Sequence, residues 1–590
     1  MKLQIDRPQV EALAAAFPRL APLQEQLRFG SRVEVLFHHL SSDELAHLGK
    51  LYAQIPKLRG RAIQLDTLRQ AMNDEGPRFN EDDLENLVPA LARYLISDAS
   101  RGWLFTANPS ARPAACVVTR VDYTPPSDDE SGKVIIELKA NARGKPAIAN
   151  IRIAGRDIAG HTVAEILAGK GYVKETPALL VAYDETAARY FDWRARYGEQ
   201  FSGRGTGVFA EDPTASHRDT DWSRKEVVVL SSSGGTARLV NDEGILAERV
   251  LTLDASGDIL GKYLRKAAKS LRYKGEDEAE ESQAAIPKGM FTELPVHFYI
   301  LMFHLDLHHY LWVHVDDLEP YAYQPALKQK LILPPEQTDL IDILTAEMDV
   351  LMDDIVEGKS GGTTVLCAGP PGVGKTLTAE VYSEIIRRPL YRVHSGQLGL
   401  NVATMETILK EVLTRAQRWG AVMLIDEADV YIRRRDDDMT ANAVVGVFLR
   451  VLEYFNGLLF LTTNRVEDID EAIVSRCIAL IKYNPPDQAG RRRIWQVMAE
   501  QFGLALAPEE VEALADLFPA ASGRDIKGLA KLVAKFCSQK SLPPSLAVFR
   551  RCAVFRGLEA HGAGWISRPG RWPGDGLPAR RWWDGWRTGP

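Results

Sequence analysis

The alternation of apolar and polar residues changes character near residue 335. After that point, short apolar runs alternate with amphipathic helical segments, which is typical of a parallel α/β sheet. Five runs have the length and composition of buried strands. They are "TTVLCA" (363–368), "LYRVH" (390–394), "AVMLI" (421–425), "LLFLTT" (458–463) and "CIALIKY" (477–483).

Between these strands the pattern predicts amphipathic helices. The helix expected over 405–419 would gather six apolar residues on one face. These are Met405, Ile408, Leu409, Val412, Leu413 and Ala416. Residues 486 to about 540 show helical periodicity only, so a helical segment is expected to follow the sheet.

The pattern before residue 335 is less regular. Residues 1–105 read as helical, because leucines recur at helical spacing in "SSDELAHLGKLYAQI" and "NEDDLENLVPALARYLI". Residues 106–330 mix strand and helix patterns, and we expect a mixed α+β domain there. Within it, "VHFYILMFHLDLHHYLWVHV" (296–315) is rich in aromatic and branched residues and predicts paired strands.

Length and composition indicate a globular protein of several domains. The chain has 590 residues, which is too long for one core, with 45% hydrophobic and 26% charged residues. A net charge of −7 does not indicate binding of nucleic acid or an acidic membrane. The five cysteines are scattered without a C-x-x-C pair, which fits a reducing compartment.

The first residues do not resemble a signal peptide, since Asp6, Arg7 and Glu11 interrupt any apolar region. No run reaches the roughly 18 to 20 apolar residues needed to cross a bilayer. We therefore expect a cytoplasmic protein without a transmembrane segment. Residues 546–590 are rich in Arg, Trp, Gly and Pro, and we expect a disordered tail there.

The segment "GPPGVGKT" (369–376) fits the phosphate-binding pattern G-x-x-x-x-G-K-T, between an apolar strand and a helix. Its glycines let backbone N–H groups face phosphate oxygens at a helix N-terminus. Lys375 would reach the β- and γ-phosphates of ATP, and the Thr376 hydroxyl would bind Mg²⁺. The expected nucleotide-binding residues are Gly369, Pro370, Pro371, Gly372, Val373, Gly374, Lys375, Thr376, Leu377 and Asp426.

A pair of carboxylates ends the third apolar run, in "AVMLIDEAD" (421–429). Asp426 at the strand tip would bind Mg²⁺ or its water shell, together with Thr376. Glu427 would orient and polarise the attacking water. A carboxylate pair at a strand end is commonly a helix cap, but its place about 50 residues after the phosphate loop favours the metal and water roles.

Taken together, the phosphate loop, "LIDEAD", "LTTNR" and "SGRDI" resemble the AAA+ ATPases in order and spacing over roughly residues 335–540. "RWGAVMLIDEADVYIRRR" and "FLRVLEYFNGLLFLTTNR" also resemble a poorly characterised fungal and bacterial AAA group. The resemblance implies a P-loop NTPase sheet, the AAA+ large domain, over 335–485. It also implies a helical lid over 486–545.

The resemblance assigns roles to three more residues. Asn464 resembles the polar residue, called sensor 1, that positions the water. Arg524 resembles the lid arginine, called sensor 2, that contacts the γ-phosphate. Arg476, before the fifth strand, resembles an arginine finger aimed at the ATP of a neighbouring subunit. The alternative for both arginines is a surface charge, which for Arg476 would be held in a salt bridge.

These assignments imply a homo-oligomeric ring, most often a hexamer in that family. ATP hydrolysis between subunits would remodel a protein client or a complex, with residues 1–330 selecting it. The loop 395–406 has no aromatic residue, which weakens a peptide-threading mechanism. Alternatives are a nucleotide-dependent assembly switch in a defence or signalling complex, and a nucleic-acid-linked ATPase.

Overall fold

A computed structural model describes the chain in two compact units, residues 1–322 and 323–590. The residues it describes are 2–108, 111–128, 130–213, 226–231, 235–246, 257–270, 273–346, 362–399, 401–435 and 439–561.

The first sheet of the N-terminal unit follows the order β12-β5-β4-β3-β7, with β6 paired to β5. Neighbouring strands are antiparallel except β12 and β5, which are parallel. The strands are β3 (Trp103–Thr106), β4 (Ala115–Thr124), β5 (Lys133–Ala142), β6 (Lys145–Ala154), β7 (Tyr172–Lys174) and β12 (Val296–His297).

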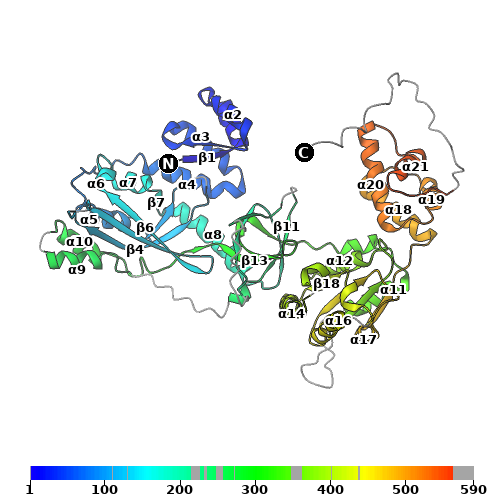
Figure 1. Ribbon diagram of the computed structural model, residues 1–590. Coiled ribbons are helices and arrows are strands. Elements are labelled where there is room, and N and C mark those ends of the chain that lie inside the picture. Colours follow the sequence, from blue (N-terminus) through cyan, green and yellow to red (C-terminus); the bar gives the residue numbers. More distant parts are fainter. Residues whose placement is uncertain are drawn as a thin grey trace, which may run out of the picture. The chain divides into compact units, whose positions relative to one another are not determined.

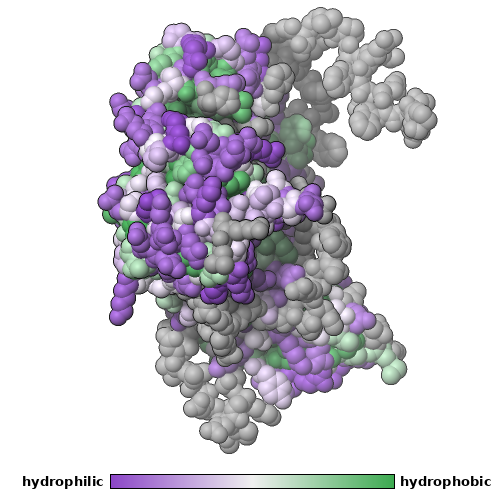
Figure 2. All heavy atoms as spheres, turned by 90° about the vertical axis from the view of Figure 1, so that its left-hand side faces the viewer, coloured by the Kyte–Doolittle hydropathy of each residue, from purple (hydrophilic) through white to green (hydrophobic). Residues whose placement is uncertain are grey.

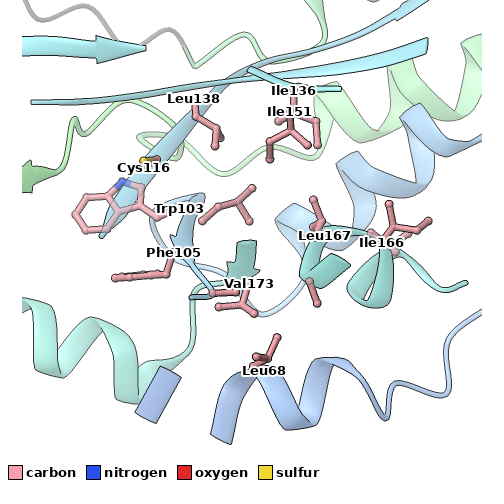
Figure 3. Packing of buried hydrophobic residues seen from close by; sticks show 14 of the residues in the cluster. Leu68, Trp103, Phe105, Cys116, Ile136, Leu138, Ile151, Ile166, Leu167 and Val173 are labelled. Carbon is pink, nitrogen blue, oxygen red and sulfur yellow. The ribbon is translucent and has the colours of Figure 1, made fainter. Parts of the chain in front are cut away.

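The core of this unit lies between that sheet and nearby helices, among them α4 (Arg59–Ala71) and α7 (Val163–Gly169). Figure 3 shows Trp103, Phe105 and Val173 of the sheet facing this core, with Leu68 and Leu167 from the helices. The cluster extends in sequence from Leu3 to Phe291. One continuous core therefore crosses the boundary expected at 105/106.

Residues 1–105 are not helical throughout, contrary to the sequence-based expectation. β1 (Lys2–Asp6) and β2 (Arg32–Leu36) form an antiparallel pair, and β3 begins at Trp103. In the first pair Leu3, Ile5, Val33 and Val35 are buried. These two runs are five residues long with alternate residues buried, a short period-2 signal that helical patterns on either side obscure.

The second sheet of the unit has the order β10-β9-β14-β13-β11-β8-β15 and is antiparallel. β13 and β14 pair from Tyr299 opposite His314 to His304 opposite His309, which confirms the paired strands predicted over 296–315. The strands are β8 (Gln200–Gly203), β9 (Thr206–Ala210), β10 (Val227–Val229), β11 (Ala237–Asn241), β13 (Tyr299–His304), β14 (His309–His314) and β15 (Leu318–Pro320).

Further helices complete the N-terminal unit (Figure 1). On the face shown in Figure 2, hydrophilic residues predominate and apolar residues form small separate areas. The remaining α-helices are α1 (Arg7–Ala16), α2 (Pro22–Gln26), α3 (Ser42–Ala53), α5 (Leu87–Ile96), α6 (Gly155–Ile158), α8 (Pro177–Arg194), α9 (Gly261–Ser270) and α10 (Glu276–Ala284).

A buried side chain of the second sheet caps α8. The amide Nδ2 of Asn241 donates to the carbonyl oxygens of Trp193, Arg194 and Arg196, at 2.9, 3.1 and 3.0 Å. Its Oδ1 accepts from the backbone N–H of Glu243 at 2.9 Å. One amide therefore binds three carbonyl oxygens at and just beyond the end of α8, where a helix leaves carbonyls without intrahelical partners.

Replacing Asn241 with alanine should destabilise this region by about 1–3 kcal/mol, the cost of leaving buried polar groups unpaired. Hydrogen exchange of the amides near the end of α8 should accelerate accordingly. Asn73→Ala is the matched control, because exposed Asn73 donates to one carbonyl only, that of Arg69. Equal protection in the two variants would contradict a structural role for Asn241.

The C-terminal unit contains a five-stranded sheet in the order β17-β18-β19-β16-β20. All its pairs are parallel, which confirms the predicted parallel α/β sheet. The strands are β16 (Thr363–Ala368), β17 (Leu390–His394), β18 (Val422–Asp426), β19 (Leu458–Thr463) and β20 (Ala479–Lys482). Each lies on one of the five predicted apolar runs.

Helices connect these strands (Figure 1). In α14 (Val402–Arg418), five of the six residues expected on one face are buried, and Ile408 is half-buried. The others are α11 (Pro335–Ala346), α12 (Lys375–Ile385), α13 (Ser395–Leu398), α15 (Asp429–Ile432), α16 (Met439–Leu452) and α17 (Glu471–Val474).

The helices that follow the sheet pack around a core of their own, coloured orange to red in Figure 1. They are α18 (Gln488–Phe502), α19 (Pro508–Leu517), α20 (Gly523–Lys540) and α21 (Leu546–Val554). The lid boundary expected at 545 therefore falls one helix too early, because Phe549, Cys552 and Ala553 of α21 are buried in this core. The rest of the predicted tail, 562–590, lies outside the described residues.

Among the helices that the structure describes, none combines the length and the apolar character required to traverse a lipid bilayer.

Candidate functional site: a nucleotide-binding edge of the parallel sheet

Most of the predicted site residues follow the carboxyl ends of strands in the five-stranded sheet. The 369–376 loop follows β16, Asp426 ends β18, and Asn464 follows β19. β18, β19 and β16 are neighbours in one parallel sheet, so their carboxyl ends lie at the same edge. The strand order thus brings together residues up to 95 positions apart in sequence, from Gly369 to Asn464.

Two glycines of the phosphate-loop segment adopt backbone conformations that other residues rarely adopt. Gly372 and Gly374 have φ angles of +84° and +106°, in the left-handed region that residues with a Cβ rarely adopt. A Cβ at Gly372 would also lie 2.7 Å from Ser522 Oγ. Pro370, Pro371 and Leu377 are exposed, and Val373 packs against the core of the sheet.

Lys375, the first residue of α12, turns its side chain back over the loop. Its Nζ donates to the carbonyl oxygens of Gly369 and Pro370, both at 2.7 Å, and to Asn464 Oδ1 at 2.9 Å. Burial lowers the pKa of Lys375 below that of an ordinary lysine, and the charge of Asp426 opposes this effect. The ammonium is thereby held against the loop that would surround the phosphates.

Asp426 is almost completely buried, and both of its carboxylate oxygens have partners. Oδ1 accepts from Thr376 Oγ1 at 3.0 Å and Thr462 Oγ1 at 2.6 Å, while Oδ2 contacts Arg392 Nη2 at 2.6 Å. Burial alone would raise the pKa of Asp426, but these hydrogen bonds and the guanidinium hold it below its usual value. The carboxylate is therefore charged at neutral pH.

Thr376 and Asp426 fit a magnesium site. A hydroxyl oxygen and a carboxylate oxygen lie 3.0 Å apart, and both are hard oxygen ligands of the kind that Mg²⁺ prefers. Mg²⁺ usually binds through one or two protein oxygens plus phosphate oxygens. This pair, next to the phosphate loop, is the donor set that such a metal–nucleotide complex requires.

Glu427 follows directly and has a different environment. Its side chain is exposed, and its φ of +56° is uncommon for a residue with a Cβ. The backbone N–H donates to Thr462 Oγ1 at 3.0 Å. The left-handed conformation therefore separates the exposed carboxylate of Glu427 from the buried one of Asp426.

Asn464 is held from two directions. Its Oδ1 accepts from Lys375, and its backbone N–H donates to Asp429 Oδ1 at 3.2 Å. Asp429 also contacts the Thr463 hydroxyl. The structure thus brings Asn464 next to the phosphate loop.

Arg524 is also beside the phosphate loop. Its backbone N–H donates to the carbonyl oxygen of Gly372 at 3.2 Å, and its side chain is exposed. It is the second residue of α20, which Ser522 caps by accepting from the N–H of Asp525. The start of this lid helix therefore packs on the loop that would hold phosphate.

Arg476 is the one predicted site residue that does not join this group. Two residues later, the N–H of Ile478 donates to the Thr364 carbonyl at 2.9 Å, at the amino end of β16. The guanidinium pairs with Glu453 Oε1 at 2.7 Å and donates to the Ala472 carbonyl at 3.2 Å. Arg476 thus lies at the edge of the sheet opposite the phosphate loop.

Several residues that support the site were missed from sequence. Thr462 donates to Asp426 and accepts from Glu427, Asp429 holds the end of β19, and Arg392 pairs with Asp426. Tyr431 donates to the carbonyl oxygens of Ser395 and Gly399 at 2.6 and 2.9 Å. Arg392 could have been singled out in the sequence, because it is a charged residue inside the apolar run "LYRVH".

Comparison with known proteins identifies this region. Residues 365–484 match the family described as "ATPase family associated with various cellular activities (AAA)". The chain is 28% identical over 150 residues to the uncharacterized AAA family ATPase y4kL of Sinorhizobium fredii, covering 24% of this chain and 46% of that protein.

Two other relatives have similar levels of identity to the chain. The ATPase family AAA domain-containing protein FIGL1 of Arabidopsis thaliana is 27% identical over 194 residues, covering 31% of this chain and 28% of that protein. The human peroxisomal ATPase PEX1 is 30% identical over 179 residues, covering 28% of this chain and 14% of that protein.

In each of these alignments the chain spans less than half of the relative's length. The match to the family and the fold of the sheet nevertheless agree with the site geometry. The chain therefore contains an AAA+ ATPase domain, with an α/β P-loop fold.

Proposed function

We propose that this protein hydrolyses ATP and uses the reaction to remodel a protein or a complex. Lys375 and the loop N–H groups would hold the phosphates, and Thr376 and Asp426 would hold Mg²⁺, which supplies positive charge to the β- and γ-phosphate oxygens. Glu427, exposed beside this group, would polarise the attacking water, which Asn464 would position. Arg524 would contact the γ-phosphate from the lid.

The observation that carries the proposal of a shared site is the place of Arg476. From Thr364 to Gly369 the strand advances about 16 Å, at roughly 3.3 Å per residue. The Arg476 guanidinium is held near the amino end of this strand by Glu453. Arg476 is therefore remote from the phosphate loop of its own chain, and it is exposed. That position suits a cation offered to the nucleotide of a second copy.

A site completed by a neighbour requires an oligomer, and a closed ring gives every copy one neighbour in each direction. We propose a homo-oligomeric ring, with a hexamer as the expected size. Binding and release of the γ-phosphate would then alter each subunit interface, because the lid helix α20 contacts the phosphate loop through Arg524 and Gly372.

Two residues of one short helix contact both this site and the segment that follows β17. Asp429 and Tyr431 lie in the same short helix, α15. Asp429 contacts the backbone of Asn464, while Tyr431 holds the backbone carbonyls of Ser395 and Gly399. A shift of Asn464 on hydrolysis would thus reach the 395–399 segment through one turn of helix. This connection favours mechanical work on a client over a purely structural role for ATP.

Two other functions remain candidates. A nucleotide-dependent assembly switch would form stable ATP-bound rings with negligible turnover, whereas a remodelling ATPase would turn over and respond to a protein client. A nucleic-acid-linked ATPase would be stimulated by DNA or RNA. Arg and Trp side chains suit contacts with phosphates and bases, but most of the Arg- and Trp-rich segment 546–590 lies outside the described residues.

The test of the shared site is an Arg476→Ala variant. Turnover should fall by about 10³-fold, the lower range for loss of an arginine finger, while ATP binding persists. Mixed with Lys375→Ala subunits, which keep Arg476 but lack the phosphate-binding lysine, the variant should regain part of its activity. ATP turnover of the mixtures, measured against subunit ratio, checks this.

Arg492→Ala is the matched control, because Arg492 is also an ion-paired surface arginine, with Glu512 in the lid. It should retain near-normal turnover. If mixed rings of the Arg476 and Lys375 variants stay inactive although they assemble, the finger does not act between subunits. Full turnover by a strictly monomeric chain would likewise exclude the shared site.

A further inference from the structure

Arg392 occupies an unusual position for an arginine. It lies in β17 between Tyr391 and Val393, which are both buried, and its side chain extends toward the phosphate-binding edge of the sheet, where it reaches Asp426. Nη2 is 2.6 Å from Asp426 Oδ2. Nη1 is 3.6 Å from Glu380 Oε1 of α12, which is beyond hydrogen-bond distance. The guanidinium is thus bonded to one carboxylate with a second one close by.

The pairing leaves Asp426 without a spare oxygen. Thr376 and Thr462 donate to Oδ1, and Arg392 covers Oδ2. A divalent cation bound at Thr376 and Asp426 would meet a guanidinium that cannot lose its charge. Two cations at one carboxylate repel each other, and burial of Asp426 weakens the screening of that repulsion.

Arg392 is not fully satisfied by its contact with Asp426. Its Nε is buried and has no hydrogen-bond partner among the described residues. Glu380, by contrast, is about 43% exposed and needs only a small movement to reach hydrogen-bond distance of Nη1. The arrangement therefore provides a second carboxylate that could receive the guanidinium once Asp426 is engaged elsewhere.

We propose that Arg392 is an internal counter-cation that competes with Mg²⁺ for Asp426 and passes to Glu380 when the metal binds. This rests on the proposed function, since it takes Thr376 and Asp426 as the site of a metal–nucleotide complex. Without metal, Arg392 offsets the negative charge of Asp426, which would otherwise repel the nucleotide phosphates held at the neighbouring Lys375. Because Arg392 has to leave Asp426 before the metal can bind there, the pairing raises the Mg²⁺ concentration that the site requires.

The experiment measures binding of a fluorescent ADP analogue to the full chain, from EDTA alone to millimolar Mg²⁺. In Arg392→Met, which keeps the length of the side chain but removes its charge, the half-saturating Mg²⁺ concentration should fall about ten-fold. Nucleotide affinity in EDTA should fall by a similar factor. Arg392→Lys, which keeps the charge, should restore much of the wild-type dependence.

Arg450→Met is the matched control, because Arg450 makes a similar contact of 2.6 Å with Glu406 away from the site. It should match the wild type at every Mg²⁺ concentration. An Arg392→Met variant with unchanged or increased Mg²⁺ requirement would overturn the proposal. Failure of the wild type to bind nucleotide at any Mg²⁺ concentration would instead refute the proposed function.

A second variant tests the same proposal if Arg392→Met does not fold. Glu380→Gln removes the charged acceptor for the displaced guanidinium while leaving Arg392 and Asp426 in place. The half-saturating Mg²⁺ concentration should then rise several-fold, while nucleotide affinity in EDTA stays the same. An unchanged Mg²⁺ requirement in this variant would overturn the exchange between the two carboxylates.

Discussion

Lys375→Ala should reduce nucleotide affinity by at least about 10²-fold, because the change removes an ammonium group that is bonded directly to two carbonyl oxygens of the phosphate loop. The lysine ammonium is already bonded to the Gly369 and Pro370 carbonyls and to Asn464. Phosphate oxygens would replace these acceptors, so its position is prepared before binding. Calorimetric titration with ADP and with a non-hydrolysable ATP analogue measures the loss.

Lys410→Ala is the control for this experiment. Lys410 is exposed on α14, where it pairs with Glu406 at 2.7 Å, and its loss should leave nucleotide affinity unchanged. The fold of both variants can be compared by circular dichroism. Wild-type affinity in a folded Lys375→Ala protein would refute the assignment of residues 369–376 as the phosphate loop.

Glu427→Gln should bind ATP with near-normal affinity and hydrolyse it about 10²–10⁴-fold more slowly, the range for loss of a general base. We expect hydrolysis to be lost while binding is kept, because the two neighbouring carboxylates lie in different environments. Asp426 is buried among Thr376, Thr462 and Arg392, whereas Glu427 is exposed and touches Thr462 only through its backbone N–H. Removing the Glu427 charge therefore leaves the proposed metal site intact.

Single-turnover hydrolysis and equilibrium ATP binding, measured on the same preparation, separate the two effects. Glu471→Gln serves as control, since Glu471 is an exposed acid in the first turn of α17 with no contact to Asp426 or Thr376 in the structure. If Glu427→Gln retained ATP turnover, a residue other than Glu427 would polarise the attacking water. The non-hydrolysing variant would also hold clients in the ATP state, so that captured proteins can be identified.

Much of the ATPase domain could be predicted from sequence because its signals are local. The three inner strands, β16, β18 and β19, are buried almost throughout in a parallel sheet, so their runs read as nearly continuous apolar stretches. The phosphate loop needs glycines at fixed spacing, and Asp426 ends an apolar strand that Glu427 directly follows. Each of these features lies within a few residues of chain.

The N-terminal unit was harder to predict, for a physical reason. β1 and β2 are short, and β3 is buried at three of its four positions, so their identity as strands depends on partners elsewhere in the chain. The helix α21 was missed at the other end because Phe549 and Cys552 become core residues only against α18 and α20. Burial of this kind is a property of the assembled fold.

The sequence by itself determined the class of the catalytic domain, its phosphate loop and its acidic pair, because strand burial and loop geometry impose local residue patterns. Only the tertiary structure decided that Arg392 and Thr462 share Asp426, and that Arg476 lies at the opposite edge of the sheet with Glu453. These contacts join residues between 23 and 36 positions apart. Strand order and register bring them together, and neither leaves a periodic signal along the chain.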